Sequence, residues 1–306
     1  MTVSDQRRSG FALCISSAAA FGALPIFGKI AFDHDANVVT LLFVRFAIAS
    51  AVLWVMVKLS GQTPRSVSRR LVVSGLVMGA AGYGLQSTMY FAALERIDAS
   101  LSALLLYAYP AMVTAIAILL GRERATPPLL AALGVATVGT LLLLNDGLGG
   151  DADTLGVLLG LGSAVCYTAY ILAGDTLVAS MPPLLLAALV TAGGAVSFGA
   201  YGAASRTLQF DIDGTAYAAI VACAVVGTVL SVGTLLAGIE RIGASMASVL
   251  STVEPATTVL LAVLFLDESA NAVQLIGGSL LIVAIVLCQR ARRPIVELEP
   301  LPGVPA

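Results

Sequence analysis

The stretch E-R-I-D-A-S-L-S-A-L-L-L-Y-A-Y-P-A-M, from Glu95 to Met112, decides the fold because a related copy occurs later in the chain. That copy is E-R-I-G-A-S-M-A-S-V-L-S-T-V-E-P-A-T, from Glu240 to Thr257. The two align without gaps as far as Glu123 and Glu268, with a constant offset of 145 residues and 11 identities in 29 positions. Shared hydrophobicity does not make charges and prolines coincide, so the similarity indicates an internal repeat. We therefore divide the chain into two homologous halves, residues 1–148 and 149–306.

Composition predicts that lipid is the solvent for most of the chain. Of 306 residues, 58% are hydrophobic and 11% are charged, and the mean hydropathy is +0.97. A soluble domain carries about 25% charged residues, because its surface must be hydrated. The net charge of -2 and the lack of a basic patch give no reason to expect a nucleic-acid partner. The four cysteines form no C-x-x-C pair, so we expect neither a metal site nor a cofactor.

The number of apolar stretches predicts how the two halves lie in the membrane. A membrane-crossing helix needs about 20 mainly apolar residues. Ten stretches qualify, at approximately 10–32, 38–58, 71–93, 98–120, 127–145, 154–175, 183–204, 215–238, 244–266 and 271–289. Each half has five, an odd number, so the second half enters the membrane upside down. The predicted fold class is an all-α integral membrane protein with ten transmembrane helices in two inverted five-helix repeats. Secondary transporters commonly have this architecture and bind substrate between the halves.

The distribution of Lys and Arg predicts the orientation, because these residues favour cytoplasmic loops. With the N-terminus inside, twelve of the 16 lie in cytoplasmic segments and only Arg96 and Arg206 lie outside. The remaining two, Lys29 and Arg45, fall within predicted spans. We therefore predict a multi-pass protein of the cell inner membrane with both termini cytoplasmic.

Each half ends in a pattern that resembles the EamA family of the drug/metabolite transporter superfamily. The first half has S-A-L-L-L-Y-A-Y-P-A-M followed by G-R-E, and the second has A-S-V-L-S-T-V-E-P-A-T followed by L-D-E. F-G-A-L-P-I-F-G-K in the first span and F-V-R-F in the second also resemble the opening of the family. The resemblance covers residues 10–289 and implies a small-molecule substrate, with export of amino acids or related metabolites. Residues 154–204 have no counterparts of Lys29 and Arg45, so the halves differ there.

Three ionisable residues, Lys29, Arg45 and Glu254, fall inside predicted spans, where a charge costs about 3 kcal/mol or more. Lys29 lies near a helix end, from which its long side chain could reach the interface. Arg45 lies deeper, and its partner could be a carboxylate, backbone carbonyls or an anionic part of the substrate. Glu254 lies near the centre of the ninth span. It is either a proton or substrate-ammonium site, or a structural partner in an ion pair, for instance with Arg45, or in a hydrogen bond.

Polar and aromatic side chains follow single faces of four predicted spans at the helical period of 3.6 residues. Such faces suit a cavity that binds small organic solutes, and they also suit simple helix–helix hydrogen bonding. The faces contain Tyr83, Gln86, Ser87 and Tyr90; Tyr107, Pro110 and Thr114; Ser163, Tyr167 and Tyr170; and Ser248, Thr252 and Pro255. From them we predict a substrate site of Arg45, Tyr83, Gln86, Tyr90, Tyr107, Tyr167, Tyr170, Thr252 and Glu254, with Glu254 as the coupling candidate.

Pro110 and Pro255 occupy equivalent positions in the fourth and ninth spans. A proline removes a backbone hydrogen bond and can kink a helix, so we predict a hinge in each half. The alternative is that membrane helices simply tolerate a proline at these positions.

These features favour a secondary transporter that exports a small metabolite, such as an amino acid, by alternating access. Proton coupling and uncoupled facilitation both stay open, and a monomer would suffice. The alternative within this class is uptake or exchange of an anionic metabolite held by Arg45 and Lys29. No G-x-x-x-x-G-K-[ST] loop is present, which argues against direct use of ATP.

Two other classes of function fit the sequence less well. An intramembrane serine protease would need a histidine base within the membrane, and the sole histidine, His34, lies in a predicted hairpin. A channel shares the composition of a carrier, and saturable flux with counterflow would distinguish the two.

The predicted topology can be tested with reporter fusions. We expect a reporter at the C-terminus to behave as cytoplasmic and one inserted at residues 146–153 to behave as periplasmic, because of the asymmetry in Lys and Arg. Alkaline phosphatase and green fluorescent protein fusions would measure this. If both reporters behaved as cytoplasmic, or both as periplasmic, the ten-span arrangement would be contradicted.

Overall fold

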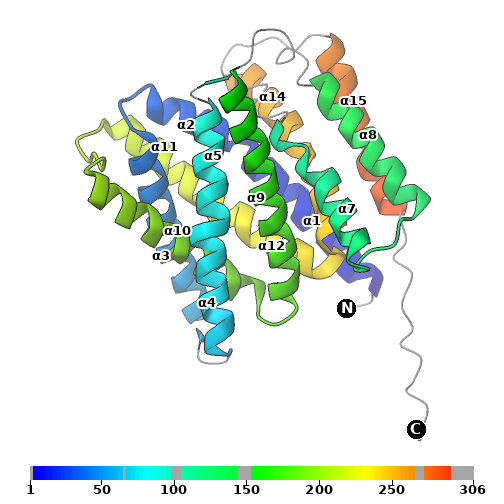
Figure 1. Ribbon diagram of the computed structural model, residues 1–306, viewed down its shortest axis with the longest axis horizontal. Coiled ribbons are helices and arrows are strands. Elements are labelled where there is room, and N and C mark those ends of the chain that lie inside the picture. The colour runs from blue at the N-terminus through cyan, green and yellow to red at the C-terminus, as the bar shows by residue number, and fades with distance from the viewer. Residues whose placement is uncertain are drawn as a thin grey trace, which may run out of the picture.

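The computed structural model describes residues 3–64, 67–94, 96–97, 105–143, 153–265 and 272–290, and the regular elements of these segments are all helical (Figure 1). The first half contains α1 (Val3–Gly22), α2 (Leu24–Phe32), α3 (Val38–Leu59), α4 (Arg69–Val77), η2 (Met78–Tyr83), α5 (Gly84–Leu94), α7 (Tyr109–Leu119) and α8 (Pro127–Leu143). The second half contains α9 (Thr154–Val178), α10 (Pro183–Ser205), α11 (Gly214–Ala224), η4 (Val225–Leu230), α12 (Ser231–Ile242), α13 (Ala244–Leu250), α14 (Val253–Phe265) and α15 (Ala272–Arg290).

The all-helical prediction is confirmed in the described segments, and five helices are long and apolar enough to cross a membrane. They span residues 5–32, 38–59, 154–178, 183–205 and 214–242. Three further apolar helices, within residues 109–119, 127–142 and 275–284, are shorter than a full span. The total of ten spans and the cytoplasmic placement of both termini stay predictions.

The two halves are interleaved. The four most extensive helix pairs are α8 with α15, α3 with α10, α1 with α12, and α5 with α9, and each pair joins the first half to the second. In Figure 1, α8 and α15 lie side by side at one edge of the molecule, and α5, α9 and α12 lie near its centre. The middle of the structure is therefore an interface between the halves, which is where inverted-repeat transporters bind their substrates.

Glycines let two of these helices approach closely. A Cβ added at Gly79 in η2 would overlap the backbone carbonyl of Val190, and one added at Gly193 in α10 would overlap the carbonyl of Leu76. Small residues at helix crossings are typical of membrane proteins, because packing replaces the hydrophobic effect as the force that holds helices together. This contact fixes the position of η2 against α10.

Two continuous spans each contain a π-helical segment. In the first half, η2 connects α4 to α5, and in the second half, η4 connects α11 to α12. A π-helical turn is rare and occurs frequently at functional sites, because the wider turn displaces side chains and carbonyls from the regular ladder.

Two other spans are broken at equivalent positions. A turn at Tyr107–Ala108 precedes α7, and a turn at Ser251–Thr252 separates α13 from α14. Pro110 and Pro255 each lie in the first turn of the helix that follows the break. Proline is tolerated there because the first turn leaves its N–H groups without helical partners. The structure thus has helix breaks where we expected kinks, and whether they act as hinges stays a prediction.

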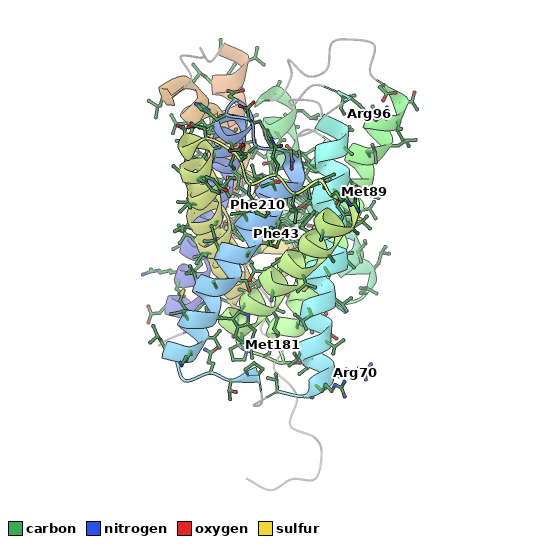
Figure 2. All side chains as sticks on the ribbon, turned by 90° about the vertical axis from the view of Figure 1, so that its left-hand side faces the viewer. Phe43, Arg70, Met89, Arg96, Met181 and Phe210 are labelled. Carbon is green, nitrogen blue, oxygen red and sulfur yellow. The ribbon has the colours of Figure 1, made fainter. Side chains whose placement is uncertain are left out.

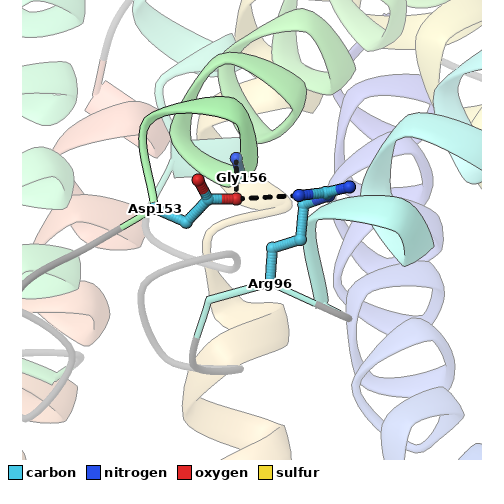
Figure 3. Close-up of polar contacts among 3 residues, drawn as sticks. All are labelled: Arg96, Asp153 and Gly156. Atoms are coloured by element: carbon cyan, nitrogen blue, oxygen red, sulfur yellow. Dashed lines mark hydrogen bonds and ion pairs between the residues drawn. The ribbon is translucent and has the colours of Figure 1, made fainter.

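Polar contacts at one end of the molecule tie the halves together. Arg96, which follows α5, donates to the Asp153 carboxylate over 3.2 Å, and the same carboxylate accepts from the Gly156 backbone N–H at the start of α9 (Figure 3). The Arg96 side chain beside it holds the pKa of Asp153 below its ordinary value.

Figure 2 shows Arg96 and Arg70 near opposite ends of the molecule. It also shows Phe43 close to Phe210, and the centroids of these two rings are 6.5 Å apart.

The glycine contact generates a stability prediction. We expect Gly79→Ala to lower the free energy of unfolding by about 1–3 kcal/mol, because the added methyl group overpacks the crossing with α10. Gly134→Ala is the matched control, since a Cβ at Gly134 meets no atom within 4 Å. Thermal melting in detergent would measure both. Equal melting temperatures for the two variants would contradict the close crossing.

Candidate functional site

Arg45 is the deepest cation of the described chain, and hydroxyl groups from both halves surround it. It lies within α3, and its side chain is 4% exposed. Its Nε donates to the Thr228 hydroxyl over 2.6 Å, and its Nη2 donates to the Tyr83 hydroxyl over 2.9 Å. A longer contact of 3.4 Å joins Nη2 to the Gly227 carbonyl oxygen. Both π-helical segments, η2 and η4, therefore contribute to holding this cation.

Aromatic rings complete the surroundings of Arg45. Its guanidinium carbon lies 5.2 Å from the ring centroid of Phe46 and 5.9 Å from that of Tyr83. A cation over a ring face is attracted by the quadrupole of the ring. Among the described residues, the ion pair is that of Arg96 with Asp153, so Arg45 has no carboxylate partner there. The hydrogen bonds that the described chain gives it use Nε and Nη2 and leave Nη1 without a protein partner.

A column of tyrosine rings leads away from Arg45. Tyr83 stacks on Tyr170 with centroids 5.4 Å apart, and Tyr170 stacks on Tyr167 at 5.7 Å. Tyr167 meets Tyr109 edge to face at 4.6 Å, and Tyr109 lies 6.3 Å from Tyr107. The rings come from η2, α9 and the start of α7, so they cross the interface between the halves. The Tyr170 hydroxyl is buried and has no hydrogen-bond partner in the described chain.

Glu254 lies at the other end of this column, in the first turn of α14 just after the break at Ser251–Thr252. The Tyr107 hydroxyl lies near enough to its carboxyl group to interact with it. The hydroxyls of Tyr90, Tyr109 and Tyr167 lie near enough to interact with its charge. Tyr107 belongs to the break of the first half, so this contact joins the two broken spans.

The structure brings together seven of the nine predicted site residues. Arg45 and Glu254 end the column, and the tyrosines that line or approach it are Tyr83, Tyr90, Tyr107, Tyr167 and Tyr170. The suggested ion pair between Arg45 and Glu254 is not formed. Arg45 instead binds hydroxyls and a backbone carbonyl, the second of the partners considered for it.

Gln86 and Thr252 make local contacts outside this column. The Gln86 side-chain amide donates to the Ser163 hydroxyl over 3.2 Å, which links α5 to α9. The Thr252 hydroxyl donates to the Val249 carbonyl over 2.6 Å within its own turn. These contacts match helix–helix and turn-stabilising roles, and a role in binding stays a prediction. Lys29 belongs to α2, and its side chain lies outside the described part of the structure.

We missed two residues of this site from the sequence, Tyr109, which lies in the column, and Thr228. Thr228 lies 145 residues after Tyr83, the offset that relates Glu95 to Glu240, so the internal repeat pairs it with a residue that we selected. A single threonine in an apolar span does not indicate a functional site, because its hydroxyl can hydrogen-bond to a carbonyl of its own helix. Extending the repeat alignment toward the N-terminus would have marked it.

The comparisons with known proteins agree with the two-part architecture. Residues 8–145 and 154–289 each match the model of the EamA-like transporter family. An uncharacterized inner membrane transporter, YicL, of Salmonella typhimurium (strain LT2) is 25% identical over 223 residues, which cover 72% of this chain and 74% of that protein. An uncharacterized transporter of Bacillus subtilis (strain 168), YcbK, is 26% identical over 285 residues, 88% of this chain and 89% of that protein.

A solved crystal structure shows the same fold. It superposes with a TM-score of 0.78 at 18% sequence identity, and the match covers 94% of this chain and all of the other. The family matches cover most of both halves, and both relatives carry the name of transporter. The chain belongs to the EamA-like transporter family and is a multi-pass membrane protein.

Proposed function

We propose that this transporter is a secondary exporter of a small metabolite, such as an amino acid, and that it works by alternating access in the cell inner membrane. The observation that carries the proposal is the tyrosine column between Arg45 and Glu254, since it has a buried guanidinium at one end and a half-buried carboxyl group at the other, at separate junctions between the halves. Charges inside a membrane protein are costly and usually mark a substrate or ion pathway.

The broken spans support a substrate site at Glu254. Substrate and coupling-ion sites in inverted-repeat transporters are typically formed by discontinuous helices at the repeat interface. Here α7 and α14 both begin after a turn, and Tyr107 and Glu254 lie near each other at these turns. A carboxyl group there can take up a proton or bind an ammonium group. We assign Glu254 as the coupling group.

The surroundings of Arg45 favour a substrate that carries an anionic group. A guanidinium without a carboxylate partner in the described chain is a favourable site for a carboxylate or phosphate, which can accept a charge-assisted hydrogen bond from Nη1. Tyrosine faces next to it suit the apolar or aromatic part of an organic solute. An amino acid has both an anionic group for Arg45 and an ammonium group that a carboxylate could bind.

A second candidate function is uptake or exchange of an anionic metabolite. The same observation favours it, because the cation at Arg45 has no described carboxylate partner. The direction of transport distinguishes export from uptake or exchange, so both efflux and uptake must be measured.

A direct test of the proposal uses purified protein in liposomes. Each member of a panel of amino acids, organic anions and cationic drugs is loaded, and efflux and counterflow are followed with and without a pH gradient. Saturable efflux of an amino acid with counterflow would support the proposal. Flux that does not saturate with any solute would indicate a channel instead.

Arg45→Lys should fail to restore the transport lost in Arg45→Ala. The guanidinium reaches Thr228, Tyr83 and the Gly227 carbonyl from one plane, whereas an ammonium is a point donor on a flexible stem. We expect initial rates to be lower by about tenfold or more in both variants, the effect of losing hydrogen bonds to a charged group. Arg206→Ala is the control, because Arg206 is exposed. Full transport by Arg45→Lys at normal expression would show that charge alone matters.

Glu254→Gln should keep the melting temperature of the protein and lose the response of transport to a pH gradient. The amide mimics the protonated carboxyl group, so substrate exchange should persist while proton-driven net transport disappears. Glu240→Gln, at the exposed end of α12, is the matched control.

The alternative role for Glu254 gives a different result. If Glu254 is instead a structural hydrogen-bond partner, its substitution should destabilise the fold by about 1–3 kcal/mol. If Glu254→Gln melts normally and its transport keeps the full response to a pH gradient, Glu254 has neither role.

A further inference from the structure

The two π-helical segments hold residues that the internal repeat makes equivalent. Tyr83 is the last residue of η2, and Thr228 lies within η4. They are 145 residues apart, the same offset as Glu95 and Glu240. One side chain, Arg45, donates a hydrogen bond to both. A single guanidinium therefore connects the same structural irregularity in the two halves.

Side-chain donors contact carbonyls of η4 and of the last turn of α11. The Gly227 carbonyl accepts from the Ser231 hydroxyl over 2.6 Å and from Arg45 Nη2 over 3.4 Å, and the Cys223 carbonyl accepts from the Thr228 hydroxyl over 3.1 Å. Carbonyls that leave the regular ladder inside a membrane protein need such partners, because lipid offers none. Arg45 and Thr228 thus support the π-helical geometry directly.

Arg45 itself is held by a rigid part of the fold. The neighbouring ring of Phe46 stacks on Phe198 with centroids 5.8 Å apart and meets Tyr83 edge to face at 5.2 Å. The ring also packs against Gly194, where an added Cβ would lie 2.9 Å from it. Because α3 packs against α10 here, the backbone of Arg45 is held in place, and its hydrogen bonds to Tyr83 and Thr228 keep the guanidinium between η2 and η4.

We propose that Arg45 is a positioning residue that latches η2 to η4, so that the two π-helical segments, one from each half, open and close together. Loss of either hydrogen bond frees the segment that made it and lets the guanidinium turn away from the other. The latch goes beyond the proposed function, since it concerns how the halves move and not which solute they carry. Its test needs no transported substrate, so it can fail independently of that function.

The test measures amide hydrogen exchange by mass spectrometry on the full chain in lipid nanodiscs. The variants are Tyr83→Phe and Thr228→Val, which remove one hydroxyl each and nearly conserve shape. We expect each to raise exchange by about tenfold in residues 78–83 and also in residues 225–230, the effect of losing one hydrogen bond to a charged group. The informative signal is the one in the half without the substitution.

Two control variants test whether the loss of any hydroxyl raises amide exchange throughout the protein. Thr234→Val removes a hydroxyl that bonds within its own helix, to the Leu230 carbonyl over 2.6 Å, and Tyr201→Phe removes one from a side chain that is 61% exposed. Neither should change exchange in residues 78–83.

The possible outcomes separate clearly. A rise confined to the segment that carries the substitution, or no rise in either, would overturn the latch. If one variant is too unstable to purify, the other tests the same coupling in the opposite direction. A rise in both segments, with Arg45→Lys giving the same pattern, would establish that the guanidinium fork connects them.

Discussion

A hydrocarbon environment offers no hydrogen bonds, so every backbone group that leaves a regular helix must find its partner inside the protein. The irregular parts of this fold meet that requirement through hydroxyl side chains. The Ser17 hydroxyl donates to the Ser231 carbonyl over 2.8 Å beside η4, and the Thr258 hydroxyl donates to the Gly22 carbonyl over 2.9 Å where α1 ends. Each of these bonds crosses from one half to the other. The places where the helices are irregular are therefore also places where hydrogen bonds connect the two halves.

The helices and the internal repeat could be predicted from sequence because both depend on local composition and on copies of one motif. The two end charges of the site, Arg45 and Glu254, were also evident, because an ionisable residue in an apolar span is conspicuous. The helix breaks and π-helical segments were not predicted. Their stability comes from contacts such as Arg45 with Thr228, which join residues 183 positions apart and leave no local pattern. The same reason explains why the partner of Arg45 was left open among a carboxylate, backbone carbonyls and an anionic part of the substrate.

The separation of the two charges matters for how a carrier of this family would work. If Arg45 and Glu254 formed one ion pair, each would neutralise the other, and a substrate would have to break the pair to bind. Tyrosine rings separate them instead. The hydroxyls of Tyr83 and Thr228 accept from Arg45, the Tyr107 hydroxyl lies near Glu254, and hydroxyls can rotate to donate or accept. In the proposed mechanism, both groups would therefore stay available to a substrate, and the hydroxyls would stabilise them in its absence.

The lack of a described counter-ion for Arg45 has an electrical consequence. A fixed positive charge within the membrane lies in the field of the transmembrane potential, and one elementary charge crossing a potential of 100 mV is worth about 2.3 kcal/mol. A change of conformation that moves the aqueous boundary from one side of Arg45 to the other changes the share of that field which the charge experiences. The resting membrane voltage would then bias the empty carrier toward one orientation, before any solute binds.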